Sequence, residues 1–305
     1  MPDNPKFIWV DGKLTPWNEA TVHISQLGTS TVSLVFEGVR AYWNDTTRKL
    51  SVFQLDAHME RFAQSIRLIR MKQPIGNAEI RQGVLDIVRA NEYAADTYIR
   101  PYAFTESATF GGMSSDQARI VLTTQPWPSR LKNGKVSNAC VSSWTRITDN
   151  VMPPRVKASS NYLNSRLASE EAKRNGYALA LILNPNGKVA EAPGACLMVV
   201  RKGKIITPSV TSGILESITR ETLIQLCREE LKLEVIEREL DRTELYTASE
   251  AFVCGTGAEI TPIASIDRFV FGDGSIGPVT QRIESLYHDL VRGIDTRHAE
   301  WRTAV

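Results

Sequence analysis

The spacing of apolar and polar residues divides the N-terminal part of the chain into strand-like and helix-like segments. The segment KFIWVDGKLTP predicts a β-hairpin that turns at Asp11-Gly12, and SLVFEGVRAYW (33–43) has the β-branched and aromatic content of a strand. Residues 97–104 and 118–124 repeat the strand pattern. Between these strands, apolar residues at helical spacing predict two helices, carried by Leu55, Met59, Phe62, Ile66 and Ile69 and by Ile80, Val84 and Ile87.

The C-terminal part repeats this mixture. Residues 139–146 predict a strand, and ALALILNPNGKVAEA predicts a strand, an Asn-Pro-Asn-Gly turn and a second strand. Helical patterns cover 161–176, which Gly176 closes, then 217–233 and 277–293.

A linker is predicted between the two parts. The segment QPWPSRLKNGK (125–135) concentrates proline, glycine and charge, as linkers do. We therefore expect an α+β protein with a small N-terminal α/β domain at 1–125, a linker at 126–135 and a larger domain at 136–305.

Composition narrows the class of protein without indicating its chemistry. The 305 residues are 42% hydrophobic and 23% charged, which is typical of a globular protein. A net charge of +2 gives no electrostatic basis for binding nucleic acid or an anionic membrane. The N-terminus lacks the apolar run of a signal peptide, and no stretch approaches the ~18 apolar residues of a membrane span. We therefore expect a cytoplasmic protein.

The cysteines and histidines do not have the spacing of a metal site. Cys140, Cys196, Cys227 and Cys254 lie far apart without a CxxC pair, which is typical of reduced cysteines. The histidines form no HExxH or similar motif. We expect no metal centre.

One glycine motif has the form of a dinucleotide-binding fingerprint. Gly272, Gly274 and Gly277 spell GxGxxG between a strand-like DRFVF and a helix that begins at Pro278. A dinucleotide fold needs a further strand and an acidic residue ~20 positions later, whereas the chain continues here as one helix and a polar tail. The motif is better interpreted as a glycine-rich turn with proline at the first helical position.

Two segments carry residues suited to the ring of a positively charged aromatic cofactor. In PRVKASSNYLNS (154–165), Lys157 lies among small and polar residues before a helix, where a buried lysine could act as an amine nucleophile. Tyr162 could donate a hydrogen bond to a phenolate oxygen. In GKVAEAPGACLM (187–198), Glu191 ends a strand among small apolar residues and needs a positive partner, which a protonated pyridine would supply. A surface lysine, a core tyrosine and an edge-strand carboxylate are the alternative interpretations.

Two further segments could bind a phosphate. SGILESITRET (212–222) leads into a helix whose first amides could face an anion, with Thr219 close by. The alternative is an ordinary helix start capped by Ser217. CGTGAEITP (254–262) has two glycines that allow a tight, amide-lined turn, with Thr256 adding a hydroxyl; a purely structural turn is the alternative.

Together and in this order, these segments resemble the class IV, or fold-type IV, aminotransferases, and branched-chain amino-acid aminotransferases most closely. The resemblance covers nearly the whole chain, through FIWVDGK, VFEGVRAY, HMERFAQS, YIRP, VSSW, VKASSNYL, SITRE, GTGAEITP and GPVTQRI. It implies a two-domain fold similar to D-amino-acid aminotransferase, with a β-barrel-like core in the larger domain. It also implies a homodimer or a larger homo-oligomer.

The resemblance implies a cofactor and the residues that hold it. Lys157 matches the lysine that forms a Schiff base with pyridoxal 5′-phosphate (PLP), and Arg61 matches the arginine on its phosphate. Tyr162 matches the tyrosine on the ring oxygen, and Glu191 the carboxylate on the pyridine nitrogen. Further cofactor contacts are expected from Leu215, which matches the residue packed on the ring, and from Ser217, Ile218, Thr219 and Thr256 around the phosphate.

The resemblance also implies a substrate pocket. Tyr98, with the turn Thr256–Ala258 that includes Gly257, matches the site for the substrate α-carboxylate. The arginines and walls of the pocket match Arg40, Arg100, Phe36 and Trp127. The implied reaction moves an amino group from a branched-chain amino acid to a 2-oxo acid such as 2-oxoglutarate.

Departures from the family pattern leave alternatives open. Thr31 stands where branched-chain enzymes commonly have a tyrosine, and residues 192–196 read APGAC where the family usually has GxGEN. Thr31 favours an (R)-selective amine or D-amino-acid transaminase on the same fold. A PLP lyase of the aminodeoxychorismate type is disfavoured because Tyr98, Arg100 and Arg40 keep the branched-chain pattern. A noncatalytic PLP-binding protein is disfavoured because Lys157 and Glu191 are both present.

Overall fold

The computed structural model describes residues 4–26, 32–105 and 117–305. The chain forms two compact units. The first contains Met1–Ser129, Val156–Ser160 and Leu290–Val305, and the second contains Arg130–Arg155 and Asn161–Asp289. No helix in the described ranges is long and apolar enough to cross a membrane.

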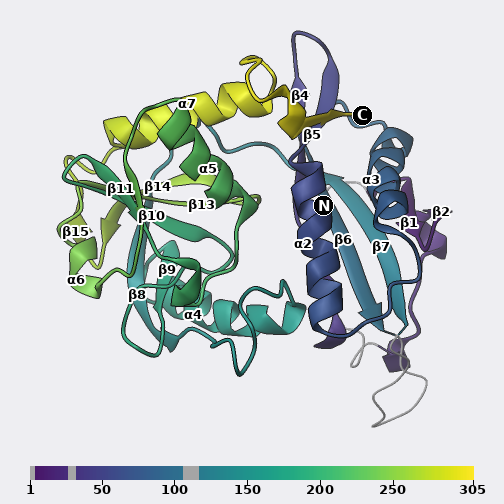
Figure 1. Ribbon diagram of the computed structural model, residues 1–305, viewed down its shortest axis with the longest axis horizontal. Coiled ribbons are helices and arrows are strands. Elements are labelled where there is room, and N and C mark those ends of the chain that lie inside the picture. The colour runs from purple at the N-terminus through teal and green to yellow at the C-terminus, as the bar shows by residue number, and fades with distance from the viewer. Residues whose placement is uncertain (1–3, 27–31, 106–116) are drawn as a thin grey trace. The chain divides into compact units, whose positions relative to one another are not determined.

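The first unit is built on one sheet with helices α2 and α3 (Figure 1). Its strands follow the order β16-β5-β4-β6-β7-β1-β2, with β3 paired to β6. The strands are β1 (Phe7–Val10), β2 (Lys13–Pro16), β3 (Val35–Phe36), β4 (Val39–Asn44), β5 (Lys49–Phe53), β6 (Thr97–Thr105), β7 (Ala118–Pro126) and β16 (Arg302–Ala304). The helices are α2 (Leu55–Leu68) and α3 (Asn77–Asn91), with 3-10 turns at Trp17–Glu19, Ile24–Gln26 and Ala299–Trp301.

The hydrophobic core of the first unit lies between one face of the sheet and the two helices. Alternate residues of β3, β4, β6 and β7 pack against the apolar sides of α2 and α3, because successive strand residues point to opposite faces. The buried strand residues include Val35, Val39, Ala41, Ile99, Ala103, Ile120 and Leu122, and the helix residues include Phe62, Ile66, Val84 and Ile87. The predicted hairpin and both predicted helices are confirmed.

The single strand predicted at 33–43 is wrong in two respects, because it begins only at Val35 and is interrupted between β3 and β4. β3 and β4 pair with β6 in one register, from Phe36 opposite Tyr102 to Val39 opposite Ile99, which places Glu37 opposite Pro101. Proline has no N–H to donate to the ladder, so this pair keeps only the bond from the Glu37 N–H to the Pro101 carbonyl, at 2.9 Å. The chain direction is kept across the gap.

The second unit is built on a mixed sheet in the order β12-β11-β10-β13-β14-β8-β9, with β15 paired to β14. Its strands are β8 (Ser137–Thr145), β9 (Leu179–Leu183), β10 (Cys196–Arg201), β11 (Lys204–Thr207), β12 (Val235–Glu237), β13 (Glu250–Gly255), β14 (Glu259–Ile266) and β15 (Phe269–Val270). Its helices are α4 (Tyr162–Arg174), α5 (Ile218–Glu229), α6 (Arg242–Leu245) and most of α7 (Pro278–Val291), with a 3-10 turn at Val210–Ser212. A further 3-10 turn, Ser159–Asn161, begins in the first unit and ends in the second. The mixed α+β class predicted from the sequence is confirmed.

The strand–turn–strand predicted after residue 177 is only half formed. β9 is present, but the segment after the turn makes only isolated bridges, between Val189 and Leu183 and between Ala192 and Ala195. This irregular backbone runs through Glu191, one of the predicted site residues.

The glycine motif before α7 is a helix-capping turn. The carboxylate of the buried Glu250 accepts hydrogen bonds from the Val279 N–H at 3.0 Å and the Thr280 N–H at 2.8 Å, at the amino end of α7. A Cβ on Gly277 would lie 2.1 Å from the Glu250 Cδ, so only glycine fits there. The amides that would bind a dinucleotide phosphate are therefore occupied by the protein's own carboxylate.

Candidate active site

Lys157 lies in the first unit, in the short segment Val156–Ser160. The Lys157 carbonyl accepts a hydrogen bond from the Phe36 N–H at 3.0 Å, and the Lys157 N–H donates to the Ser65 hydroxyl at 3.3 Å. These bonds tie the segment to β3 and to α2. The side chain is half-buried, and its Nζ lies 4.8 Å from the centre of the Phe36 ring. The backbone of Lys157 is therefore fixed by hydrogen bonds, and its side chain is not fully exposed.

Arg61 lies on α2 in a buried cluster that the sequence did not reveal. The fully buried carboxylate of Glu37 accepts hydrogen bonds from Arg61 Nε at 2.7 Å and Nη2 at 2.8 Å, and from His58 Nδ1 at 2.8 Å. Glu37 takes up one edge of the guanidinium and so fixes its plane. Strand alternation places Glu37 on the helix side of the sheet, together with Val35 and Val39.

The protonation states in this cluster follow from its charges. Burial alone would raise the pKa of Glu37, but the charge and hydrogen bonds of Arg61, with a hydrogen bond from His58, hold that pKa well below its usual range. Burial lowers the pKa of His58 against the opposing effect of Glu37, and the charges of Arg61 and Lys157 lower it further. At about pH 7 the His58 ring is therefore neutral and carries its proton on Nδ1, facing an ionised Glu37.

The predicted substrate residues of the first unit share the sheet face that points away from the helices. The register sets Arg40 opposite Tyr98, and Arg40 Nη1 donates to the Trp127 carbonyl at 3.2 Å. The Tyr98 and Trp127 rings lie 5.5 Å apart. A Cβ on Gly38 would lie 1.9 Å from the Tyr98 hydroxyl, so Gly38 gives the phenol its place. The structure thus brings together the residues Phe36, Arg40, Tyr98, Arg100 and Trp127, while Thr31 lies outside the described residues.

Glu191 lies in the second unit, where its buried carboxylate forms an ion pair with Arg146. The Arg146 Nη2 and Glu191 Oε1 are 2.5 Å apart, and both side chains are almost completely buried. Arg146 is held in turn by the Gly213 carbonyl, at 3.1 Å from Nε. The Leu215 N–H donates to Glu191 Oε2 at 3.2 Å. The sequence indicated that Glu191 needs a positive partner but did not identify Arg146, the residue that follows β8.

A cysteine completes the surroundings of Glu191. The Cys196 Sγ lies 3.9 Å from Glu191 Oε2 and 3.6 Å from the Leu215 carbonyl. Burial, with the nearby Glu191 charge, raises the pKa of Cys196 well above its usual value, so the group is a neutral thiol. Cys196 stands opposite Cys254 on β10 and β13, and both are free.

The predicted phosphate seat is the amino end of α5. The helix begins at Ile218, and the Ser217 hydroxyl accepts a hydrogen bond from the Arg220 N–H at 3.2 Å. The capping role considered for Ser217 is therefore present. The buried Thr219 follows in the first turn, where N–H groups and the helix dipole favour an anion.

The second predicted anion-binding turn joins β13 to β14. Gly255 pairs with Glu259, which leaves Thr256, Gly257 and Ala258 in the turn. A Cβ on Gly255 would lie 3.3 Å from the Gly194 carbonyl, so the turn packs closely on the loop that follows Glu191. Tyr162, at the start of α4, lies near the same loop, because a Cβ on Gly194 would be 3.8 Å from the Tyr162 ring. Tyr162, Glu191 and this turn thus belong to one neighbourhood of the second unit.

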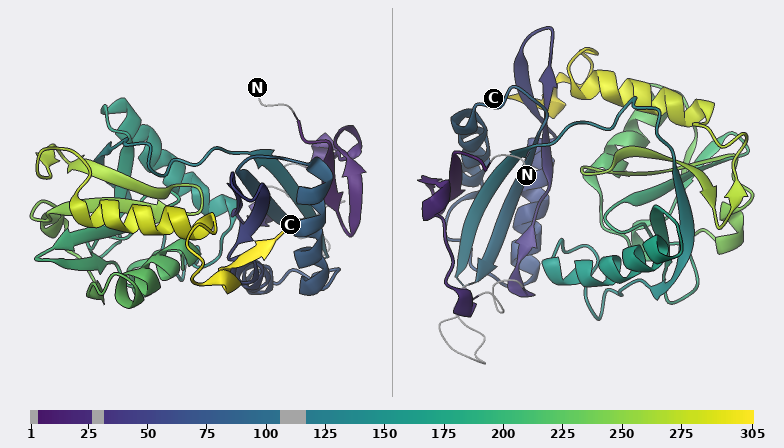
Figure 2. Two further views of the ribbon diagram at one scale, coloured as in Figure 1. Left: turned by 90° about the horizontal axis from the view of Figure 1, so that it is seen from above. Right: turned by 180° about the vertical axis from the view of Figure 1, so that it is seen from behind.

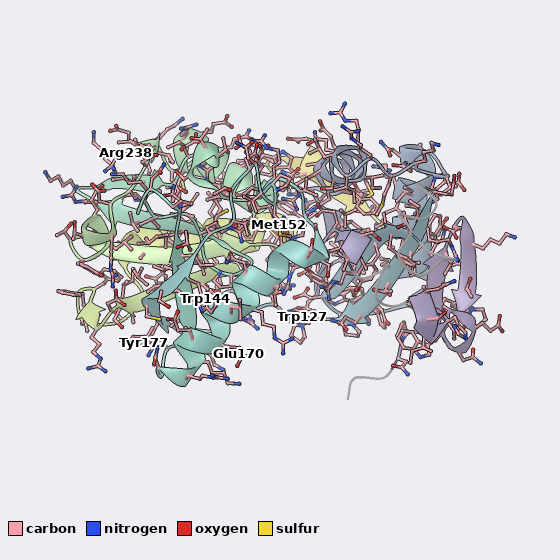
Figure 3. All side chains as sticks on the ribbon, turned by 90° about the horizontal axis from the view of Figure 1, so that it is seen from below. Trp127, Trp144, Met152, Glu170, Tyr177 and Arg238 are labelled. Atoms are coloured by element: carbon pink, nitrogen blue, oxygen red, sulfur yellow. The ribbon has the colours of Figure 1, made fainter. Side chains whose placement is uncertain are left out.

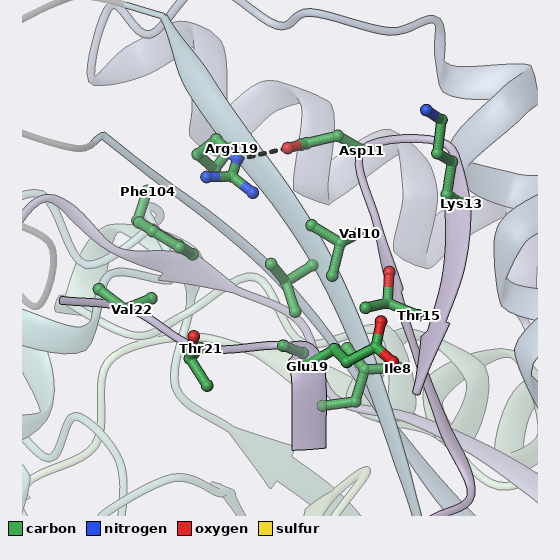
Figure 4. A pocket seen from close by; sticks show the side chains of 12 residues that line it. Ile8, Val10, Asp11, Lys13, Thr15, Glu19, Thr21, Val22, Phe104 and Arg119 are labelled. Carbon is green, nitrogen blue, oxygen red and sulfur yellow. Dashed lines mark hydrogen bonds and ion pairs between the residues drawn. The ribbon is translucent and has the colours of Figure 1, made fainter. Parts of the chain in front are cut away.

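Two hollows elsewhere contain none of the predicted site residues. One, of about 460 Å³, lies on the first unit over β1, β2 and β7, and an ion pair between Asp11 and Arg119 is part of its lining (Figure 4). The other, of about 370 Å³, lies along α4 and includes Trp144 and Glu170 (Figure 3). Among the described residues, those that line these two hollows offer no arrangement of nucleophile, base and acid.

Comparisons with known proteins give the family. Residues 34–266 match the model described as amino-transferase class IV. A probable branched-chain-amino-acid aminotransferase of Aquifex aeolicus (strain VF5) is 38% identical over 300 residues, which cover 98% of this chain and 96% of that protein. The solved branched-chain amino acid aminotransferase of Thermobaculum terrenum, in its PLP form, is 50% identical with a TM-score of 0.96 and covers 99% of this chain and 98% of that one. The solved enzyme of T.th., complexed with N-(5′-phosphopyridoxyl)-L-glutamate, is 33% identical with a TM-score of 0.92, and the match covers 99% of each chain. The predicted family is thus confirmed, and the chain belongs to the class IV aminotransferases.

Proposed function

We propose that this enzyme binds PLP and moves the amino group of a branched-chain amino acid to a 2-oxo acid such as 2-oxoglutarate, with Lys157 as the catalytic lysine. The proposal depends on two ion pairs that are largely buried. In one, Glu191 with Arg146 can accept a hydrogen bond from a protonated ring nitrogen; in the other, Arg61 with Glu37 can bind a phosphate through Arg61. One of the solved relatives is in its PLP form and another holds a phosphopyridoxyl adduct, which supports this choice of cofactor.

The donor set fits PLP group by group. An aldehyde requires an amine, which Lys157 supplies from a segment tied to β3 and α2. A doubly charged phosphate requires cations and amides, which Arg61, the start of α5 and the turn at Thr256 supply. A phenolate oxygen requires a donor, which Tyr162 can supply. A pyridinium requires an anion, which is Glu191.

The chain's own residues define the chemistry. When bound, the cofactor ring accepts the electrons that remain on the substrate carbon after a proton is removed. Lys157 Nζ would take that proton from the substrate α-carbon and hold it for return. Glu191 holds the proton on the ring nitrogen, and Arg146 compensates the burial of the carboxylate charge. The Leu215 N–H and the Cys196 thiol fix the orientation of that carboxylate.

Substrate selection is assigned to the sheet face of the first unit that points away from the helices. Tyr98, with the amides of Thr256–Ala258, takes the substrate α-carboxylate. Arg40 and Arg100 supply positive charge for a second carboxylate, while the rings of Phe36 and Trp127 tolerate an alkyl chain. An acceptor such as 2-oxoglutarate and a donor such as leucine can then share one pocket.

A second candidate is an (R)-selective amine or D-amino-acid transaminase on the same fold. Thr31, in place of the family's tyrosine, favours it because a threonine is too short to replace a phenol and leaves more room. We further propose that the enzyme works in the cytoplasm as a homodimer or larger homo-oligomer, with residues 136–305 forming most of the cofactor site.

The test of the function is a covalent trap followed by a half-reaction screen. Borohydride reduction of the PLP-loaded enzyme should attach the cofactor to Lys157, and Lys157→Ala should lose transamination, whereas Lys49→Ala on β5 should not. A labelled peptide that contains a different lysine would overturn the assignment. The screen follows cofactor absorbance with leucine, D-alanine and (R)-1-phenylethylamine. Turnover of leucine alone supports the branched-chain function, and turnover of the amine alone supports the second candidate.

A further inference from the structure

Arg100 is a long, exposed side chain on β6, and a residue that captures a carboxylate must be held in place to select for it. A free arginine loses rotamer entropy on binding, which weakens its preference for a charged ligand. The contacts that orient Arg100 therefore matter for substrate choice.

Two aromatic rings lie against the Arg100 guanidinium. Its Cζ is 5.1 Å from the centre of the Phe36 ring and 5.5 Å from the centre of the Tyr102 ring, both within the range of a cation–π interaction. Phe36 and Tyr102 are direct cross-strand partners on β3 and β6. The two rings thus form one aromatic platform, defined here as Phe36 and Tyr102.

The register explains why the guanidinium reaches this platform. Between the pairs Phe36–Tyr102 and Arg40–Tyr98, the position opposite Arg100 is Gly38, which has no side chain. Arg100 and Tyr102 are two residues apart on one strand and share a face. The Tyr98 hydroxyl fills the space that a side chain at Gly38 would take, and the Arg100 guanidinium lies toward Phe36, the next residue on that face of the neighbouring strand.

We propose that Tyr102 is a specificity-determining positioning residue, whose ring holds Arg100 where it receives the distal carboxylate of a dicarboxylic 2-oxo acid. This inference rests on the proposed function, in which Arg100 supplies charge to the acceptor. Tyr102 lies just beyond the YIRP motif and was not among the residues expected to contact substrate. Its position also bears on Thr31: a platform at Tyr102 preserves selection of a dicarboxylate without a tyrosine at position 31.

The experiment compares two acceptors in the PLP-loaded enzyme with leucine as donor. Tyr102→Leu should raise KM for 2-oxoglutarate about threefold to tenfold and leave KM for 3-methyl-2-oxobutanoate within about twofold. Tyr102→Phe keeps the ring and should retain the wild-type ratio. Phe104→Leu is the matched control, because Phe104 is the next residue on the same face of β6 and lines the hollow of Figure 4.

A double-mutant cycle tests whether Tyr102 acts through Arg100. In an Arg100→Ala background, Tyr102→Leu should add no further change in the acceptor ratio. An equal rise of KM for both acceptors, or a loss of the ratio in Tyr102→Phe as well, would overturn the proposal. The proposed function fails separately, if the wild type does not transaminate leucine with either acceptor.

Discussion

Arg61 is the residue at which cofactor binding can be separated from folding. Its guanidinium is held by Glu37, and its positive charge is expected to attract the cofactor phosphate. A charge-assisted hydrogen bond contributes about 1.5–3 kcal/mol, so Arg61→Ala should weaken PLP binding about tenfold or more. Titration of the apoprotein with PLP and with pyridoxal, which lacks the phosphate, measures the effect.

The pyridoxal titration is necessary because Arg61→Ala also leaves the buried Glu37 without its main partner. Lost stability would weaken both ligands, whereas a lost phosphate contact weakens only PLP. Arg67→Ala, an exposed arginine on the same helix, serves as the control. Equal losses for PLP and pyridoxal would contradict the phosphate role of Arg61.

Candidate site residues could be chosen from the sequence where the local sequence alone indicates chemistry. Lys157 and Glu191 were candidates because each is a charged residue among small neighbours. The ion-pair partners could not be predicted, because Arg146 meets Glu191, and Glu37 meets Arg61, only through tertiary packing. Glu37 is part of VFEGVRAY, but its role depends on α2, which places His58 and Arg61 against it.

At the scale of elements, the start of α7 offers a test of the glycine interpretation. A Cβ on Gly277 would lie 2.1 Å from Glu250, so Gly277→Ala must displace the carboxylate that caps the helix. Overpacking and the lost cap should lower the free energy of unfolding by about 1–3 kcal/mol. Gly76→Ala is the matched control, because Gly76 also precedes a helix but a Cβ added there would meet no atom within 4 Å. Equal unfolding midpoints for the two variants in urea would contradict this account.

Most elements followed from periodicity, and the exceptions have physical causes. The strand at 33–43 is interrupted because Glu37 faces Pro101, a residue far along the chain that no local signal connects to it. The strand expected after the turn at 184–187 is reduced to single bridges. Both exceptions lie at predicted site residues or next to them, where local strand propensity yields to side-chain placement.

At the scale of the whole molecule, the C-terminal strand pairs with a strand of the N-terminal part of the chain. β16 pairs with β5, from Arg302 opposite Phe53 to Ala304 opposite Ser51, so the last strand completes the edge of the first sheet (Figure 2). The buried Asp96 accepts two hydrogen bonds from Arg292 in the same unit. Such long-range pairing leaves no periodic signal in the sequence, because the segment is only three residues long.

Two carboxylates that are paired with arginines, Glu37 and Glu244, predict how the stability of the molecule depends on pH. Burial raises the pKa of Glu37, but Arg61 and the hydrogen bond from His58 outweigh it and hold that pKa well below its usual range. Hydrogen bonds from Arg238 lower the pKa of Glu244 to about 2. Between about pH 4.5 and 2 the unfolded chain therefore binds protons that the folded chain does not. Stability from these groups should be complete above about pH 5 and should be lost as the pH falls through that window, which thermal unfolding midpoints across the window would measure.

Variants assign this acid sensitivity to particular groups. Glu37→Gln removes a titrating carboxylate, so it should lower the melting temperature near neutral pH and flatten the fall below about pH 4.5. Asp56→Asn removes an exposed pair with Arg81 and should keep the wild-type slope, because exposed pairs contribute little. If Glu37→Gln is too unstable to purify, Glu244→Gln makes the same comparison in the second unit. A wild-type slope in both glutamate variants would show that acid unfolding depends on other carboxylates.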